Sequence, residues 1–293
     1  MYITQEEYRK MDGISSSVLK KLLISDAHLD FVLKNGWPKT DSIILGSAVH
    51  SFLLEPDKFP YQRVPEFYKR AYNGHRAGDP KLDETGREIE MLMHSSDSSL
   101  DIKGESLKKY DAMIRSVAEC EEASYMIKLK QFVEESFFID YMGLTLKVRC
   151  DFIYVDDLGR KWIVDIKTIG GSFDLPSKSD SFSRDMLKLG YDVQAYMYTE
   201  VIKNFIPDIY GFKFLCIDAK VPSGVKIYNI IPGESEWYEL GGYRFHDALE
   251  RYKKFVSKKT FKTYDVCEES EPPLSFEAAS ILSSYREKGE KNV

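Results

Sequence analysis

The sequence predicts a mixed α/β fold in which a central mixed β-sheet is flanked by helices and preceded by a helical N-terminal subregion. In residues 1–128 apolar residues recur mainly at helical spacing, whereas from about residue 131 they alternate as in half-buried strands. Beyond residue 168, helix-like and strand-like stretches follow one another, which favours helices packed on a sheet. There is no internal repeat and no low-complexity linker, so we expect a single domain over residues 1–293.

The N-terminal subregion is expected to consist of helices and one long loop. Thr4 with Glu7 three residues later has the pattern of a capping box, which predicts a helix start. Pro56 is expected to end a strongly apolar helix, and the polar, Gly- and Pro-containing residues 58–83 predict the loop. The expected helices begin at Thr4, Ser15 and Asp26 and then cover residues 42–54, 83–96 and 105–128.

Residues 129–260 are expected to form the core of the domain, and residues 261–293 a C-terminal helical tail. The alternating stretches predict strands at 131–140, 144–155, 161–168, 209–218 and 225–231. The helical stretches predict helices at 182–204 and 234–258.

Composition sets limits on location and partners. The 41 basic and 47 acidic residues give a net charge of −6, so any contact with a polyanion must be local. No stretch approaches the roughly 18 apolar residues that a membrane span needs, and the first residues lack the apolar segment of a signal peptide. We therefore expect a cytoplasmic protein without membrane contact. The cysteines are too far apart for a CxxC metal site and are expected to be free thiols: Cys120, Cys150, Cys216 and Cys267.

The segment 144–168 predicts a β-hairpin that turns at Leu158 and brings charged residues together. If the two strands pair symmetrically, Asp151 lies opposite Asp165 and Arg149 lies opposite Lys167. Because side chains alternate, Asp165 and Lys167 share one face of the strand. The other face is expected to carry Trp162, Val164, Ile166 and Thr168.

Two like charges opposite each other destabilise a sheet unless a positive charge compensates them. A pair of carboxylates suits Mg²⁺, with Mn²⁺ as a substitute, and both ions accept phosphate oxygens as further ligands. Lys167 would then position or activate an attacking water, which predicts metal-assisted phosphodiester hydrolysis. The alternative is that Asp151 and Asp165 form ordinary surface ion pairs, but Asp165 interrupts the apolar run WIVDI, where an idle charge is costly.

Asp151 followed by Asp165-Ile166-Lys167 resembles the D…(D/E)xK motif of the PD-(D/E)xK nuclease superfamily. Gln194 and Tyr198, spaced Q-x-x-x-Y on the next helix, resemble the additional motif of its RecB-like branch and lie on one helical face. The alternative is that neither residue belongs to a site: Tyr198 would then be a core residue and Gln194 an amide on the helix surface.

The N-terminal half is similar to RecE-type exonucleases (exonuclease VIII) and their phage relatives, in GISSSVL, DAH and LGSAVHSFLLEP. This resemblance implies a restriction-endonuclease-like core and a 5′→3′ exonuclease that degrades linear double-stranded DNA with Mg²⁺. It also implies 3′ single-stranded tails for recombination by annealing, a RecT-like annealing protein as partner, and a ring-shaped homo-oligomer. An endonuclease of the same fold and a non-catalytic DNA-binding or assembly module are the alternatives.

The same resemblance implies the remaining site residues. His50 would bind the metal together with Asp151, Asp165 and the carbonyl of Ile166, although a histidine bonded within its own helix is the alternative. Glu134, or else Glu135, would be a further site carboxylate in an E-x-S strand. Candidate DNA contacts are Ser15 and Ser17 at a helix start, which helix capping would also explain. The basic residues that could contact DNA phosphates, or else only serve solubility, are Lys20, Lys21, Lys69, Arg70, Lys147 and Arg149.

Overall fold

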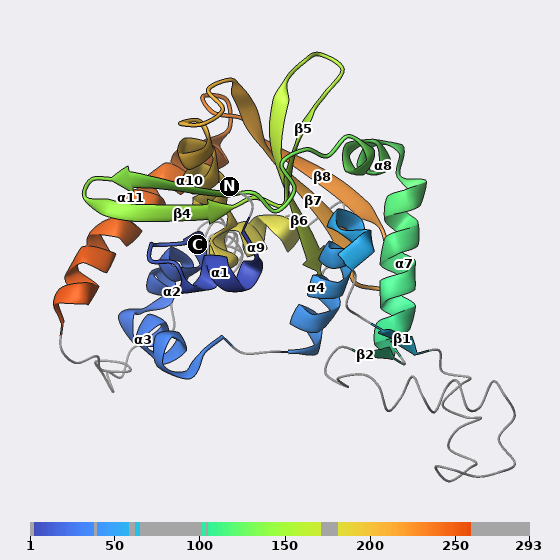
Figure 1. Ribbon diagram of the computed structural model, residues 1–293, viewed down its shortest axis with the longest axis horizontal. Helices are drawn as coiled ribbons and strands as arrows, with labels where there is room; N and C mark the ends of the chain where they lie inside the picture. The colour runs from blue at the N-terminus through green and yellow to red at the C-terminus, as the bar shows by residue number, and fades with distance from the viewer. Residues whose placement is uncertain are drawn as a thin grey trace, which may run out of the picture. The chain divides into compact units, whose positions relative to one another are not determined.

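A four-stranded mixed sheet lies between two groups of helices in the computed structural model (Figure 1). The structure describes residues 3–37, 40–58, 62–64, 101–103, 105–170 and 181–258, all within the unit Met1–Lys259. The predicted helix at 83–96, most of the predicted loop at 58–83 and the predicted tail at 261–293 lie outside these residues, as does Cys267. Within the described ranges, no helix combines the length and apolar character needed to cross a membrane.

The sheet has strand order β5-β6-β7-β8. β5 pairs with β6 and β7 with β8 in antiparallel fashion, and β6 pairs with β7 in parallel. The parallel pair needs a crossover, which the two helices between β6 and β7 provide. The strands are β5 (Phe152–Val155), β6 (Lys161–Ile169), β7 (Ile209–Asp218) and β8 (Val225–Ile230). Two further pairs stand apart: β1 (Gln62–Val64) with β2 (Asp101–Lys103), and β3 (Ser136–Tyr141) with β4 (Leu144–Arg149).

The helices begin as the sequence predicts at most positions. Thr4 forms the predicted capping box, because its hydroxyl accepts from Glu7 N at 3.2 Å and Glu7 Oε2 accepts from Thr4 N at 2.8 Å. Ser25, rather than the predicted Asp26, caps the third helix. The first helices are α1 (Gln5–Lys10), α2 (Ser16–Ile24), α3 (Asp26–Asn35), α4 (Asp41–Leu54) and the short 3₁₀ helix η1 (Pro56–Lys58). The later ones are α7 (Glu105–Glu119), α8 (Glu121–Lys128), α9 (Ser181–Leu189), α10 (Tyr191–Ile202) and α11 (Glu236–Ser257).

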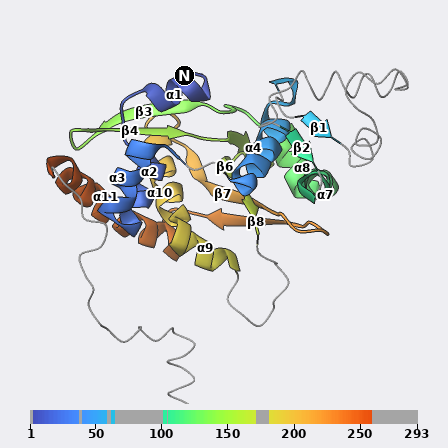
Figure 2. The same ribbon diagram turned by 90° about the horizontal axis from the view of Figure 1, so that it is seen from below.

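Each face of the sheet is covered by its own helices and forms its own core (Figure 2). Trp162, Val164 and Ile166 of β6 pack with α4, α7 and α8. Ile163 and Ile169 face the opposite core, with α2, α10 and α11. The predicted alternation along β6 is therefore confirmed, and it directs Asp165 and Lys167 toward α10.

Three predicted elements are interrupted. The stretch 105–128 is two helices separated at Cys120, and 182–204 is two helices separated at Gly190, whose φ of 66° is left-handed. The prediction of one continuous strand over 144–155 is wrong, because the chain leaves one sheet after Arg149 and enters another at Phe152. The predicted strand 131–140 begins only at Ser136.

A buried ion pair fixes α10 against α11. Asp192 on α10 is fully buried, and both of its carboxylate oxygens accept from Arg244 Nη1, at 2.7 and 2.6 Å. Arg244 Nη2 also donates to the carbonyl of Leu187 on α9 at 2.9 Å. Burial raises the pKa of Asp192, and Arg244 opposes this shift. One arginine thus joins the three helices α9, α10 and α11.

We expect Arg244→Met to lower the free energy of unfolding by about 3 kcal/mol, because it leaves the Asp192 charge buried without its partner. Urea titration followed by circular dichroism measures this. The double variant Asp192→Leu/Arg244→Met should recover most of the loss, since no buried charge remains. Lys253→Met, which breaks an exposed pair with Glu250 on the same helix, is the control and should cost under about 0.5 kcal/mol. Equal losses in Arg244→Met and the control would contradict the assignment.

Candidate active site

The candidate site is built where β6 continues past the end of its neighbour β5. Phe152, the first residue of β5, pairs with Val164, in the register that the sequence predicts. Beyond this pair the backbone of Ile166 meets side chains instead of a strand. Ile166 N donates to Asp151 Oδ2 at 2.7 Å, and the Ile166 carbonyl lies 2.8 Å from His50 Nε2. Two predicted site residues thus satisfy the backbone of a third.

His50 reaches the site from α4. Its Nδ1 lies 3.4 Å from Asp151 Oδ2, so the ring stands between Asp151 and the Ile166 carbonyl. Burial lowers the pKa of His50, with Asp165 opposing this shift, so the neutral ring is favoured. Gly46, one turn earlier, allows the close approach, because a Cβ there would lie only 2.9 Å from Thr168 Oγ1 on β6.

Asp165 is held from two sides on the opposite face of β6. It is 4% exposed, its Oδ1 accepts from Gln194 Nε2, and its Oδ2 forms an ion pair with Lys167. Oδ2 accepts no well-oriented hydrogen bond from the residues that the structure describes. Burial is the largest single effect on Lys167 and would lower its pKa, but Asp165, Tyr191 and Asp151 together outweigh it and raise the pKa, so the side chain is an ammonium. The ammonium lies 4.8 Å from the ring centre of Tyr191.

Negative charge is concentrated around Asp151. Burial, then Asp165 and Glu134, raise the pKa of Asp151 well above its usual value. Burial also raises the pKa of Glu134, which Arg149 opposes through an ion pair. The charge of Asp165 also raises the pKa of the Glu134 carboxyl. Glu134 stands in a left-handed turn with φ of 53° just before β3, not within the predicted strand.

Tyr198 lies one turn after Gln194 and is buried in the core between α10 and the sheet. Burial raises the pKa of its hydroxyl, to which Ser16 is hydrogen-bonded. Sequence reasoning did not single out Tyr191, although an aromatic residue three positions before Gln194 was a visible signal. Its ring supports the ammonium of Lys167.

Two of the basic residues proposed as DNA contacts, Lys147 and Arg149, are engaged within the chain. Lys147 is 7% exposed, and its ammonium donates to the carbonyls of Tyr8, at 3.1 Å, and Met11, at 2.5 Å. Arg149 pairs with Glu134 and donates to the carbonyl of Ile3 at 2.8 Å, so the prediction that it lies opposite Lys167 is wrong. The reason is that β4 pairs with β3 and not with β6.

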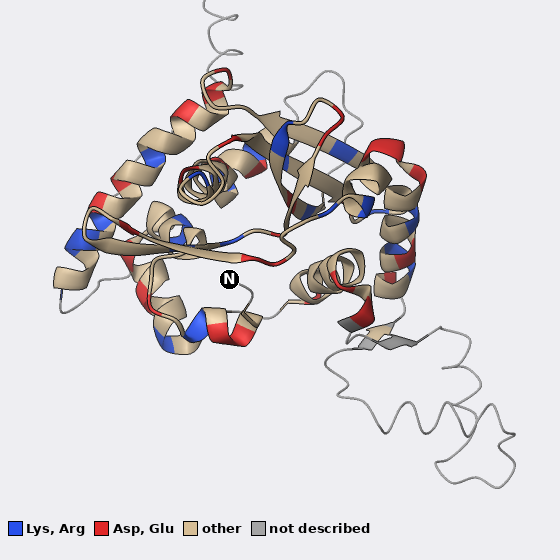
Figure 3. Ribbon diagram, turned by 45° about the horizontal axis from the view of Figure 1, so that its top comes forward, with Lys and Arg blue, Asp and Glu red and all other residues tan. Residues whose placement is uncertain are grey.

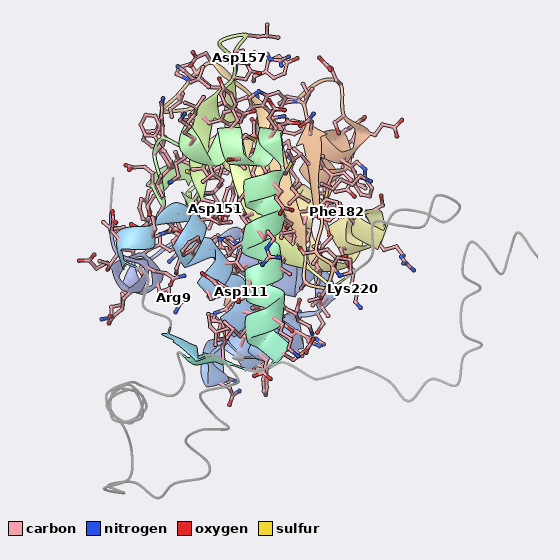
Figure 4. The ribbon with its side chains drawn as sticks, turned by 90° about the vertical axis from the view of Figure 1, so that its right-hand side faces the viewer. Arg9, Asp111, Asp151, Asp157, Phe182 and Lys220 are labelled. Carbon is pink, nitrogen blue, oxygen red and sulfur yellow. The ribbon has the colours of Figure 1, made fainter. Side chains whose placement is uncertain are left out.

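The other proposed DNA contacts divide by position. Ser15 precedes α2 without a side-chain cap bond, and Ser17 is exposed in the first turn of that helix. Lys69 and Arg70 lie outside the described residues. In the view of Figure 3, acidic and basic residues mix along α7 and α11, in line with the absence of a net basic charge. Figure 4 shows Asp151 beside α4, well away from Asp157 at the tip of the β5–β6 hairpin.

The donor set fits a hard divalent cation. It combines the carboxylates of Asp151 and Asp165, the Ile166 carbonyl and a neutral His50, and it leaves Asp165 Oδ2 without a well-oriented donor. In the described ranges no three His, Cys, Asp or Glu side chains are grouped closely enough to hold a metal ion, and Lys167 pairs with Asp165.

Comparison with known families agrees with this arrangement. The profile of a family described as "PDDEXK-like domain of unknown function (DUF3799)" matches residues 15–272. The chain belongs to this family. It therefore has the restriction-endonuclease-like fold that the sequence predicts, and fold and motif together support a hydrolytic nuclease. Divalent metals are the usual cofactors of PD-(D/E)xK nucleases.

One solved structure agrees on the fold. A protein from Eubacterium rectale, named a "putative exonuclease", superposes with a TM-score of 0.59 at 14% identity, covering 94% of this chain and 97% of its own. A second structure, of the protein SSO0001, has a TM-score of only 0.29 at 12% identity over 71% of this chain and 84% of its own, which is too low to indicate a shared fold. No curated protein matches the sequence.

We expect Asp151→Asn to stabilise the metal-free protein and to remove its response to divalent cations. The raised pKa of Asp151 means that its protonated form favours folding, and this contribution is lost as pH rises through that pKa. Above it, the neutral amide should gain on the order of 1 kcal/mol over the carboxylate. Melting curves at pH 8 with EDTA and with Mg²⁺ measure both effects.

The exposed Asp140→Asn on β3 is the matched control and should behave as the wild type in both solutions. Mg²⁺ should raise the melting temperature of the wild type and of the control but not of Asp151→Asn. An equal rise in all three proteins would show that Asp151 is not a ligand.

Proposed function

We propose that the protein is a Mg²⁺-dependent 5′→3′ exonuclease that degrades linear double-stranded DNA and leaves 3′ single-stranded tails for recombination by annealing. The observation that carries the nuclease assignment is the convergence of Asp151, Asp165 and Lys167 with His50 and the Ile166 carbonyl at one open edge of β6. The preference for ends and the direction of digestion come from the RecE-type resemblance of the N-terminal half.

The roles of the residues follow from their contacts. Asp151, Asp165, His50 and the Ile166 carbonyl would hold Mg²⁺, and Glu134 would act on the same or a second ion. The bound cation would supply Lewis-acid activation of water and of the scissile phosphate. Lys167, an ammonium in this arrangement, would orient the attacking water and stabilise the charge that develops on the phosphate.

Gln194 and Tyr198 support these groups from α10. The amide of Gln194 donates to Asp165, so it sets the direction in which the carboxylate presents its other oxygen. Tyr198 is held within the core close to both aspartates, whose charges act on its hydroxyl. We therefore assign both residues to bracing the site.

Wild-type protein with Mg²⁺ should release a 5′ label from linear duplex DNA, leave a covalently closed circle intact, and stop in EDTA. Lys167→Ala should lower the rate by at least about 100-fold, because charge stabilisation at the phosphate is lost. The assay follows separate 5′ and 3′ end labels over time, with Mn²⁺ in a parallel series.

Lys161→Ala is the matched control, since Lys161 lies on the same strand but pairs with Asp208 at the far end of the hairpin. It should retain full activity. Cutting of the circle would move the assignment to an endonuclease of the same fold. DNA binding without digestion in either metal would instead support the assignment as a non-catalytic DNA-binding or assembly module.

The resemblance also leads us to propose a ring-shaped oligomer around DNA and a RecT-like annealing protein as partner. A ring would hold DNA by topology, so a protein with net charge −6 would not need a broad basic face. Sedimentation equilibrium should give a mass that is a multiple of 33.9 kDa. A single species at 33.9 kDa over the whole concentration range would exclude the ring.

A further inference from the structure

Two helices meet at the site with matched spacing. On α2, Ser16 and Lys20 are four residues apart, and on α10, Gln194 and Tyr198 are also four apart. Lys20 Nζ donates to Gln194 Oε1 at 2.9 Å, and Ser16 is hydrogen-bonded to Tyr198. Because i and i+4 share a helical face, α2 presents a complementary pair to the Q-x-x-x-Y motif. Through this pairing, α2 contacts the candidate site.

Lys20 determines which way the Gln194 amide points. A carboxylate only accepts hydrogen bonds and a lysine ammonium only donates them. With Asp165 on one side and Lys20 on the other, the amide must turn its nitrogen to Asp165 and its oxygen to Lys20. Without Lys20, the oxygen loses this donor, and the amide is anchored at one end only, by its bond to Asp165.

The path of the Lys20 side chain is built into the backbone. Gly190, left-handed with φ of 66°, ends α9 and precedes α10. A Cβ at this glycine would lie 2.8 Å from Lys20 Cγ and 3.2 Å from its Cδ, so the stem of Lys20 occupies the space that a side chain would take. The ammonium then lies 5.3 Å from the ring centre of Tyr191, whose ring also supports Lys167.

We propose that Lys20 is a positioning residue of the nuclease site, which fixes the amide of Gln194 and, through it, the carboxylate of Asp165. The inference rests on the proposed function and deepens it, because it names a residue on α2 that acts without touching the reacting atoms. Sequence reasoning had placed Lys20 only among general phosphate contacts.

The electrostatics of Lys20 agree with a dedicated role. Burial and then Lys167 lower the pKa of Lys20 to about 7, against the opposing effects of Asp165 and Asp192. Lys21, its neighbour on α2, lowers the pKa further. A lysine so placed is costly to keep charged, unlike an exposed lysine that serves solubility.

The test is a double-variant cycle on duplex digestion with Mg²⁺. Lys20→Met should lower kcat about tenfold and change KM for DNA by less than about twofold, because ground-state binding is untouched. Lys20→Arg should restore part of the rate by donating again to Gln194. In Gln194→Met the further change Lys20→Met should have less than about a twofold effect, since both act through one contact. Lys34→Met, which breaks an exposed pair on α3, should match the wild type.

The rival role, direct contact with the DNA backbone, gives different results. KM would rise, the effect would persist in Gln194→Met, and the dependence on salt would weaken. Additive losses of this kind would overturn the proposal while leaving the nuclease assignment intact.

A second readout does not need activity. In protein labelled with ¹⁵N-glutamine, the side-chain NH₂ signals of Gln194 should be present at pH 6.5 and should shift or exchange faster with water in Lys20→Met. Unchanged signals would refute the positioning role. A wild type without nuclease activity would instead refute the proposed function, and the NMR result would still decide the role of Lys20.

Discussion

The backbone of Ile166 is the point on which the site depends. β6 outruns its neighbour β5, so the amide and carbonyl of Ile166 need partners other than a strand, and an unpaired buried polar group is costly. Asp151 and His50 are those partners. Their positions in turn require that β5 start at Phe152 and that α4 approach β6 closely at Gly46.

The balance of charge explains why two of the carboxylates at the site are paired with basic side chains. Asp165 is buried and Asp151 is half-buried, and each charge raises the energy of the other. Lys167 neutralises one of them by pairing with Asp165, while Arg149 pairs with Glu134 nearby. In the metal-free protein these cations balance the carboxylates, and a bound divalent ion would supply positive charge to the same groups.

Much of this arrangement is visible in the sequence because it follows from period and turn chemistry. The register of β5 with β6 is predictable, since alternation fixes the faces and the Asp-Asp-Leu-Gly turn fixes the centre. The pair Gln194 and Tyr198 follows from the resemblance to the Q-x-x-x-Y motif, and helical spacing places both on one face. The capping box at Thr4 is equally local.

What escaped prediction depends on tertiary contacts. The change of sheet at Cys150 and Asp151 is stabilised by a turn in which Phe132 and Glu134 are left-handed, a conformation that neither residue type indicates. Arg149 was therefore assigned to the wrong sheet. The helix break at Gly190 is indicated in the sequence by the glycine itself. That a glycine there also leaves room for the Lys20 side chain is visible only in the structure.

The open edge of β6 also bears on solubility. An unpaired strand edge is a template for strands of other chains, and proteins cover or charge such edges to prevent aggregation. Here Asp151 and His50 occupy the backbone groups of Ile166 that a foreign strand would otherwise bind. Under the proposed function, the residues that would equip the edge for chemistry also keep it from recruiting a neighbour, so replacing either of them would remove two independent roles.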